Sequence, residues 1–281
     1  MTDCGAMRVA VVGHVEWIQF AVVPHMPVAG EIVHADETFE EPAGGGAVAA
    51  MQLAKLAGEA TLFTALGDDD FGHRAERRLR ELGLRVRVAW REEPQRRGFV
   101  HLDSDAERTI TVIGSRLGPR GDDPLPWHEL GETDAVYFTA GDAAAVRATR
   151  AAHILVGTAR GLDTLAEAGV DIDALVSSSR DVGERYESGD LDPPPRLVVR
   201  TAGSSGGEFE TADGRKGSWE ATAPPGPPRD AYGCGDSFAA GLTYGLGAGK
   251  SPEDALELGA RCGAACLTGR GPYEGQLRAG G

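Results

Sequence analysis

Short apolar runs that alternate with helical segments constrain the fold of this chain most. From residue 135 onward the order is regular: strand 135–139, helix 143–151, strand 153–156, helix 161–168 and strand 174–176. The apolar runs are too short for helices and rich in β-branched residues, as buried strands are. Because parallel strands need crossover helices, the alternation predicts an α/β sandwich of three layers, with a mainly parallel central sheet.

The same two kinds of segment occur on either side of this stretch. Further strands are expected over 8–12, 60–66, 85–90 and 197–200, and further helices over 47–57, 70–82, 236–246 and 252–267. Asp213 and Gly214 form a turn signal between two more extended pieces. The alternation therefore covers most of the chain.

Four extended pieces lack the helices that would place them in the parallel sheet: residues 17–23, 31–39, 98–102 and 108–113. The first two are separated by a turn rich in proline and glycine, and the last two have the pattern of a hairpin. We therefore expect a single domain over residues 1–281, in which about 14–40 and 97–114 form a small β-lid on the main sheet.

Composition excludes several classes of function. The 281 residues include 28 Lys and Arg against 43 Asp and Glu, a net charge of −15, which argues against nucleic acid as a partner. The apolar runs are far shorter than the ~20 residues of a membrane helix, and the N-terminus has no signal-peptide pattern. The cysteines do not suggest a disulfide framework: Cys4, Cys234, Cys262 and Cys266. We expect a cytoplasmic protein with no membrane partner.

The segment from Asp230 to Gly241 holds the most informative chemistry. A glycine-rich turn with Gly233 and Gly235 leads directly into a helix whose first residues include Asp236. A helix N-terminus presents free N–H groups and a partial positive charge, which suit a phosphate or an oxyanion. Asp236 beside such a site can act as the base that deprotonates an attacking hydroxyl. An ordinary N-cap aspartate after a glycine turn explains the same local sequence equally well.

This segment, D-A-Y-G-C-G-D, resembles the C-terminal signature D-T-x-G-A-G-D of the ribokinase-like (PfkB carbohydrate kinase) family, with Ala231 and Cys234 as departures. Three further segments resemble family motifs in the same order: Gly44-Gly45-Gly46 with the following helix, Asp105-Ala-Glu-Arg-Thr109, and Val198 to Gly206. The resemblance covers about residues 8–273. It implies a Rossmann-like sandwich with a four-stranded β-lid.

The resemblance also implies roles for individual residues. Asp236 would be the catalytic base, and the amides of Gly233, Cys234 and Gly235 would form the anion hole for the transferred phosphate. The remaining cofactor residues would be Thr201, Gly203, Ser204 and Gly206 for ATP, and Asp230 for a monovalent cation such as K⁺. The family's N-x-x-E motif for Mg²⁺ falls on Ser178 and Asp181, of which Asp181 could hold Mg²⁺-bound water. A capped helix start explains Ser178 and Asp181 equally well.

The acceptor side departs further from the family. Relatives that bind sugars often have an Asp and an Asn where this chain has Ile18 and Val48, so free pentose should bind poorly. The remaining candidates for acceptor contacts are His14, Glu16, Gly44, Gly45 and Gly46. Trp17 could stack on a ligand, but lid packing is the favoured interpretation.

Together these features predict ATP- and Mg²⁺-dependent phosphorylation of a small-molecule hydroxyl, on a sugar or sugar derivative. The alternatives are a nucleoside kinase of the same fold and a catalytically inactive ligand-binding or regulatory member. By resemblance, the lid implies a homodimer. A basic stretch between residues 74 and 97, with nine Arg and four Glu, is either a docking face for an anion or, as we favour, a solvated helix face.

Overall fold

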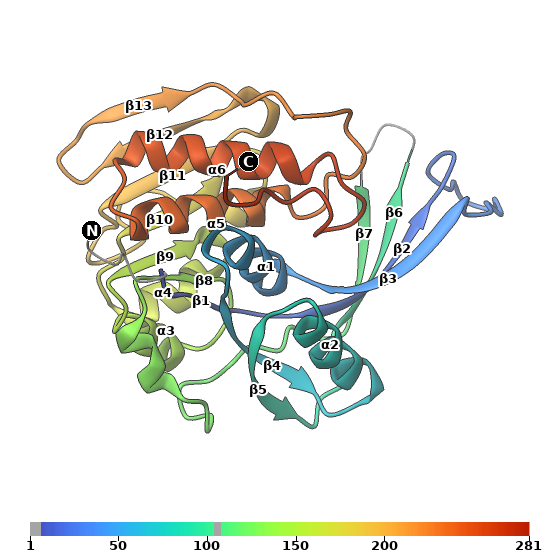
Figure 1. Cartoon of the computed structure of the whole chain (residues 1–281), viewed down its shortest axis with the longest axis horizontal. Helices are drawn as coiled ribbons and strands as arrows, with labels where there is room; N and C mark the ends of the chain where they lie inside the picture. The colour runs from blue at the N-terminus through green and yellow to red at the C-terminus, as the bar shows by residue number, and fades with distance from the viewer. Residues whose placement is uncertain (1–6, 104–107, 281) are drawn as a thin grey trace.

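A nine-stranded sheet runs through the centre of the computed structural model, which describes residues 7–103 and 108–280 (Figure 1). Its strand order is β13-β12-β11-β10-β9-β8-β1-β4-β5. The strands are β1 (Val9–Val12), β4 (Thr61–Gly67), β5 (Arg85–Arg91), β8 (Ala135–Phe138), β9 (Ile154–Thr158), β10 (Ala174–Ser178), β11 (Leu197–Thr201), β12 (Gly207–Thr211) and β13 (Lys216–Trp219). All neighbours from β11 to β5 are parallel, so the predicted parallel sheet is confirmed.

Helices cover both faces of this sheet. One face packs on α1 (Gly45–Ala57), α2 (Asp70–Glu81), α5 (Cys234–Gly247) and α6 (Pro252–Cys266), and the other on α3 (Ala143–Thr149) and α4 (Leu162–Ala168). Successive side chains of β1 divide between the two cores: Val9 and Val11 belong to the first, Ala10 and Val12 to the second. Because strand side chains alternate between faces, an entirely apolar strand is what a sheet covered on both sides requires.

The far edge of the sheet is antiparallel. β12 pairs antiparallel with both β11 and β13, and the turn between β12 and β13 contains Asp213 and Gly214, as predicted. A short 3-10 helix at Trp127–Glu132, before β8, was not predicted.

A second, four-stranded sheet projects from the main body, with the order β3-β2-β6-β7 (Figure 1). It is formed by β2 (Glu16–Val22), β3 (Glu37–Ala43), β6 (Arg97–Leu102) and β7 (Arg108–Ile113). The expected strand at 31–39 was wrong at its start. Since Val22, the last residue of β2, pairs with Glu37, residues 31–36 have no neighbouring strand and remain in the connecting loop.

The segment after α6 returns across α1 and closes the structure. The Gln276 side chain donates a hydrogen bond to the Val48 carbonyl oxygen (2.9 Å), and Gln52 donates to the Leu277 carbonyl oxygen (2.8 Å). The Tyr273 hydroxyl donates to the carbonyl oxygen of Pro42, at the end of β3. This segment therefore connects α1 to the second sheet. Within the part of the chain that is described, every helix is too short or too polar to cross a membrane.

Candidate functional site

The glycine-rich turn and the first turn of α5 form the centre of the candidate site. The helix begins at Cys234, two residues earlier than predicted, and Gly233 is its N-cap with φ of 82°. Glycine adopts this left-handed conformation without the strain that a Cβ would bring. A Cβ there would also lie 2.8 Å from Cγ1 of Val48, so the turn packs closely against α1. The early start leaves the amides that follow Gly233 free of partners within the helix.

The Asp236 carboxylate lies against the glycine segment at the start of α1. A Cβ on Gly45 would come within 2.9 Å of Asp236 Oδ1. Burial and, secondarily, the nearby Glu184 raise the pKa of Asp236 to about 6, although Arg108 and Arg160 act in the opposite direction. A carboxylate with this pKa is ionised at neutral pH and is a stronger base than an exposed aspartate.

His14 and Glu16 lie on the other side of the same glycines. Gly44 has φ of 84°, and a Cβ there would lie 3.1 Å from the His14 ring and 3.2 Å from Glu16 Cγ. Both side chains are buried, and His14 Nε2 lies 3.6 Å from Glu16 Oε1. Burial and, secondarily, nearby arginines lower the pKa of His14 well below its ordinary value, so the ring is neutral. Among the described residues, His14 Nδ1 is buried without a hydrogen-bond partner.

The structure therefore brings all of the predicted acceptor residues together near Asp236 or the turn before it: His14, Glu16, Gly44, Gly45, Gly46 and Val48. Ile18 is different. It is fully buried, and a Cβ on Gly98 of β6 would lie within 2.5 Å of its Cδ1, so Ile18 packs inside the second sheet. Trp17 is confirmed as a packing residue, because Arg74 stacks 4.3 Å from its ring centroid and the ring is 6 % exposed.

Three arginines surround the acceptor side, and sequence reasoning assigned none of them to the site. Arg96 pairs with Glu16 (Nε to Oε1, 2.7 Å) and is largely buried, although it belongs to the basic stretch that we interpreted as a solvated face. Burial, followed by repulsion from Arg96 and Arg160, lowers the pKa of Arg116. Arg160 comes two residues after the end of β9. Its place at the carboxyl edge of a parallel strand was the signal that could have found it.

The predicted metal residue Asp181 forms part of a turn after β10. Ser178 Oγ accepts hydrogen bonds from the amides of Arg180 and Asp181, both at 3.2 Å, and Asp181 is the N-cap of the short 3-10 helix Val182–Glu184. Asp181 Oδ1 accepts from the Gly183 amide at 2.8 Å, and Oδ2 lies 2.6 Å from the Arg160 guanidinium. Glu184, which the sequence analysis did not select, pairs with the same Arg160.

The predicted nucleotide loop follows β11. Gly203 and Gly206 both have positive φ, 61° and 79°, and a Cβ on Gly206 would overlap the Trp219 carbonyl oxygen. Thr201 Oγ1 donates to the Ser177 carbonyl oxygen at 3.1 Å, and the Arg180 guanidinium lies 3.4 Å from Ser204 Oγ. Thr201, Gly203, Ser204 and Gly206 therefore lie at the carboxyl edge of the sheet, where α/β proteins bind ligands.

Asp230 is buried beneath the glycine-rich turn. Its carboxylate accepts hydrogen bonds from the Tyr232 amide (2.8 Å) and the Gly271 amide (3.0 Å). Burial raises its pKa. Asp230 thus joins the turn before α5 to the segment after α6.

The cysteines of the site are thiols. The Cys234 and Cys266 side chains hydrogen-bond to each other, and Cys262 and Cys266 are buried in α6. Cys4 lies outside the described residues, as do 105–107 of the predicted lid motif; Arg108 of that motif begins β7 and its charge acts on Asp236.

Comparison with known proteins agrees with this geometry. The model of the pfkB family of carbohydrate kinases matches residues 6–156 and 142–278. An ATP-dependent ribose-1-phosphate kinase of Halopiger xanaduensis is 30 % identical, over 92 % of this chain and 91 % of the relative.

Two solved structures share the fold. The ribokinase of Thermotoga maritima has a TM-score of 0.77 at 19 % identity, covering 97 % of this chain and 96 % of the other. The adenosine kinase of Sinorhizobium meliloti has a TM-score of 0.74 at 18 % identity, covering 95 % and 96 %. The family match spans nearly the whole chain, glycine-rich turn included. This chain belongs to the pfkB family of carbohydrate kinases, and it is an ATP-dependent phosphotransferase that acts on a hydroxyl group of a sugar or nucleoside.

Proposed function

We propose that this kinase phosphorylates a primary hydroxyl of a pentose derivative, with Asp236 as the catalytic base. The observation that carries the proposal is the position of Asp236: its carboxylate lies in the first turn of α5, against Gly45, with its pKa raised to about 6. An acceptor hydroxyl over the glycines at the start of α1 would be within reach of this base.

The chemistry follows from this placement. Asp236 takes the proton of the acceptor hydroxyl as the oxygen forms its bond to the γ-phosphorus, and the bond from that phosphorus to the β,γ-bridging oxygen breaks to release ADP. The amides of Gly233, Cys234 and Gly235 stabilise the charge on the transferred group, since they point out of the helix start. Thr201, Gly203, Ser204 and Gly206 hold the nucleotide at the carboxyl edge of β11.

Two carboxylates are suited to Mg²⁺. Asp181 and Glu184 lie in one turn and share Arg160, and oxygen donors of this kind hold Mg²⁺ through its bound water. When bound, the ion neutralises charge on the ATP phosphates. For Asp230 the proposal is narrower. Because its oxygens already accept two backbone hydrogen bonds, Asp230 shapes the loop beside which a monovalent cation such as K⁺ would bind.

The identity of the acceptor follows from the replaced contacts. Ile18 is buried in the second sheet and Val48 packs against Gly233, so neither offers a hydrogen bond to a free pentose. The relative from Halopiger xanaduensis is described as acting on ribose 1-phosphate. We propose ribose 1-phosphate as the first acceptor to test, ahead of ribose and of a nucleoside.

The second sheet supports a homodimer and a lid. Every residue of β7 is exposed, and its edge carries Ile110, Val112 and Ile113, each 41 % to 45 % exposed. Unpaired edge strands with apolar side chains are usually covered in the assembled protein. We propose that a second copy covers β7 and that the sheet closes over the acceptor. A Val112→Arg variant should then sediment as a monomer, and an unchanged oligomeric state would contradict this assignment.

Incubation with ATP and Mg²⁺ and with ribose 1-phosphate, ribose or a nucleoside tests the proposal. ADP should form above the no-acceptor background with at least one of them, and Asp236→Asn should abolish this formation. An inactive ligand-binding member would instead show thermal stabilisation by an acceptor without any ADP. ADP formation that persists unchanged in Asp236→Asn would refute the assigned base.

A further inference from the structure

A cavity of about 430 Å³ lies beside the acceptor site, at the carboxyl ends of β8 and β9. Its walls come from the loop after β7, from the end of β8 and from the turn after β9. Thr139 lines it, and its charged lining residues are Arg91, Glu93, Arg116, Arg120, Asp142 and Arg160. The mechanism proposed above uses only Arg160, which pairs with the two carboxylates proposed for Mg²⁺.

Thr139 joins the cavity to the acceptor site. It lines the cavity, and a Cβ on Gly13 would overlap its hydroxyl oxygen. Gly13 in turn packs against Gly46, in the glycine segment that contacts Asp236. Thr139 and Gly13 therefore connect the glycine segment to the wall of the cavity. The nucleotide loop after β11 is separated from β8 by two strands, β9 and β10, so the cavity is on the acceptor side of the site.

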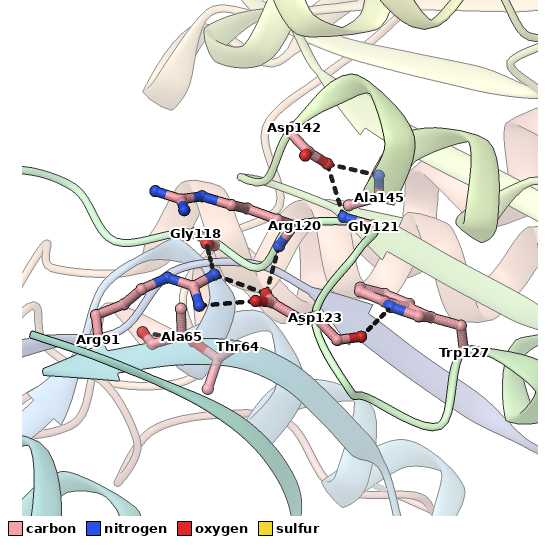
Figure 2. Close-up of polar contacts among 10 residues, drawn as sticks. All are labelled: Thr64, Ala65, Arg91, Gly118, Arg120, Gly121, Asp123, Trp127, Asp142 and Ala145. Atoms are coloured by element: carbon pink, nitrogen blue, oxygen red, sulfur yellow. Dashed lines mark hydrogen bonds and ion pairs between the residues drawn. The ribbon is translucent and has the colours of Figure 1, made fainter. Parts of the chain in front are cut away.

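Part of the charge around the cavity is already neutralised. Figure 2 shows Arg91 and Asp123 facing each other in a bidentate pair, with distances of 2.7 and 2.6 Å. Asp142 accepts from the Gly121 amide at 2.9 Å and caps α3. The guanidinium of Arg120 extends away from this pair and is joined to none of the residues drawn in Figure 2.

Arg116 is the unmatched charge. Within the described part of the chain it has no ion-pair partner. Burial and the nearby Arg96 and Arg160 lower its pKa, while Glu16 and Asp236 act more weakly in the opposite direction. Arg96 and Arg160 are paired with Glu16 and with Asp181 and Glu184, respectively. A guanidinium that has no carboxylate paired with it is stabilised when an anion binds beside it.

Thr139 supplies a second, independent signal. Its side chain is 3 % exposed, and its hydroxyl oxygen has no hydrogen-bond partner among the described residues. A buried hydroxyl without a partner is costly, and a ligand oxygen in the cavity would satisfy it.

We propose that this cavity binds a phosphate group that the acceptor sugar already carries, with Arg116 and Arg120 as its charged ligands and Thr139 as a neutral donor. The inference rests on the proposed function, because it places the acceptor hydroxyl at Asp236 and the phosphate of the same molecule beyond Thr139. It explains how the chain selects its acceptor without the sugar contacts that Ile18 and Val48 replace: the phosphate supplies the binding energy.

Kinetics with matched acceptors test this assignment. Ribose 1-phosphate and ribose are compared as acceptors for the wild-type enzyme, Arg116→Gln, Thr139→Val and the control Arg215→Gln, which removes a charge at the distant β12–β13 turn, where Arg215 pairs with Glu253. Arg116→Gln should raise KM for ribose 1-phosphate on the order of 10- to 100-fold with little change in kcat, as expected for losing a charged hydrogen bond made before and during the reaction. Thr139→Val should raise it several-fold. The control should match the wild type.

Two results would overturn the cavity assignment and leave the kinase function intact. One is a wild-type enzyme that uses ribose as efficiently as ribose 1-phosphate. The other is an Arg116→Gln variant with equal losses for both acceptors, which would place Arg116 on the transferred phosphoryl group. Calorimetric titration of ribose 1-phosphate without ATP decides the matter if no transfer occurs: tight binding that Arg116→Gln weakens upholds the cavity while the proposed function fails, and no binding overturns both.

Discussion

The two sides of the candidate site present positive groups of different kinds. At the start of α5 the positive groups are backbone amides, positioned by Gly233 and the helix itself. Around the cavity they are the guanidinium groups of Arg116 and Arg120, from a loop that follows the second sheet. Amides fixed by a helix act only at short range, whereas guanidinium groups attract an anion from a distance. In a chain with a net charge of −15, the first arrangement suits the transferred phosphate and the second suits recruitment of an anionic acceptor.

The largest effect is expected from the residue between the two sides. Asp236→Asn should lower kcat by about 10²- to 10⁴-fold, because it removes the base and leaves the geometry nearly intact. Since burial raises the folded-state pKa of Asp236 to about 6, its ionisation destabilises the folded state increasingly as the pH rises from about 4 to above 6. The variant should therefore be more stable than the wild type by about 1–3 kcal/mol at pH 8, with the difference shrinking toward pH 4. Stopped assays and thermal melts at both pH values measure these effects; a variant that is inactive and also less stable at pH 8 would contradict the burial argument.

The backbone side can be broken at Gly233. Gly233→Ala should lower kcat by on the order of 10- to 100-fold. The new Cβ strains a residue with φ of 82°, and its close contact with Val48 displaces the amides of the turn. Val48→Ala in the same chain should restore part of the activity by removing the 2.8 Å contact. A double variant no better than Gly233→Ala would show that backbone strain alone is responsible.

The pH dependence of kcat/KM tests the environment of Asp236. Below pH 6, kcat/KM should fall about tenfold for each pH unit, since the base must be ionised and its pKa is raised to about 6. Profiles of the wild type and Arg215→Gln, measured with saturating ATP, should coincide. A profile that is flat down to pH 5 would be inconsistent with the environment described for Asp236.

Ionic strength should affect the two sides of the site differently, and its effect on KM should be smaller than the effects described above. Raising NaCl from about 50 to 300 mM should increase KM for the anionic acceptor several-fold, because exposed guanidinium groups are screened. The increase should be much weaker in Arg116→Gln and absent for uncharged ribose. Equal salt dependence of KM for ribose and for ribose 1-phosphate would contradict the role proposed for the arginines around the cavity.

The smallest effect is expected at Cys234. Cys234→Ala restores the residue typical of the resembling motif and retains the amide, so kcat should change less than about threefold, as a contribution from the backbone predicts. The thiol hydrogen bond to Cys266 is lost, which should lower the melting temperature slightly. A large loss of activity would mean that the thiol itself contacts substrate.

The backbone side of the site and its arginine side also differ in how well the sequence predicts them. Gly233 and Asp236 were selected because a glycine turn before a helix is a local pattern, and Gly45 because its segment resembles a family motif. Arg96 and Arg116 come from segments whose meeting depends on the complete fold, so no local pattern reveals them. Arg160 could have been found from its position just after the parallel strand β9. Asp181 was selected by alignment with a motif, while Glu184, which shares Arg160 with it, was not.

The fold was more predictable than the site. Most strands and helices were predicted from the sequence because the hydrophobic pattern of an apolar strand or an amphipathic helix shows which of its residues are buried. The start of β3 was misplaced because strand length is set by the partner: Val22 ends β2 opposite Glu37. The antiparallel pairing of β12 and β13 also depends on which strands lie beside them in the sheet, and the sequence pattern does not show this.

The segment after α6 bears on the order in which the molecule assembles. Gln276 and Leu277 hold α1 through contacts that span 228 and 225 residues of chain, and Asp230 ties the same segment to the turn before α5. Contacts of such long range form late in folding because a large loop must be closed before they can form, and closing it costs chain entropy. A chain that has formed only β1, α1 and the second sheet therefore still lacks the contacts that this segment makes with α1 and with Asp230 before α5.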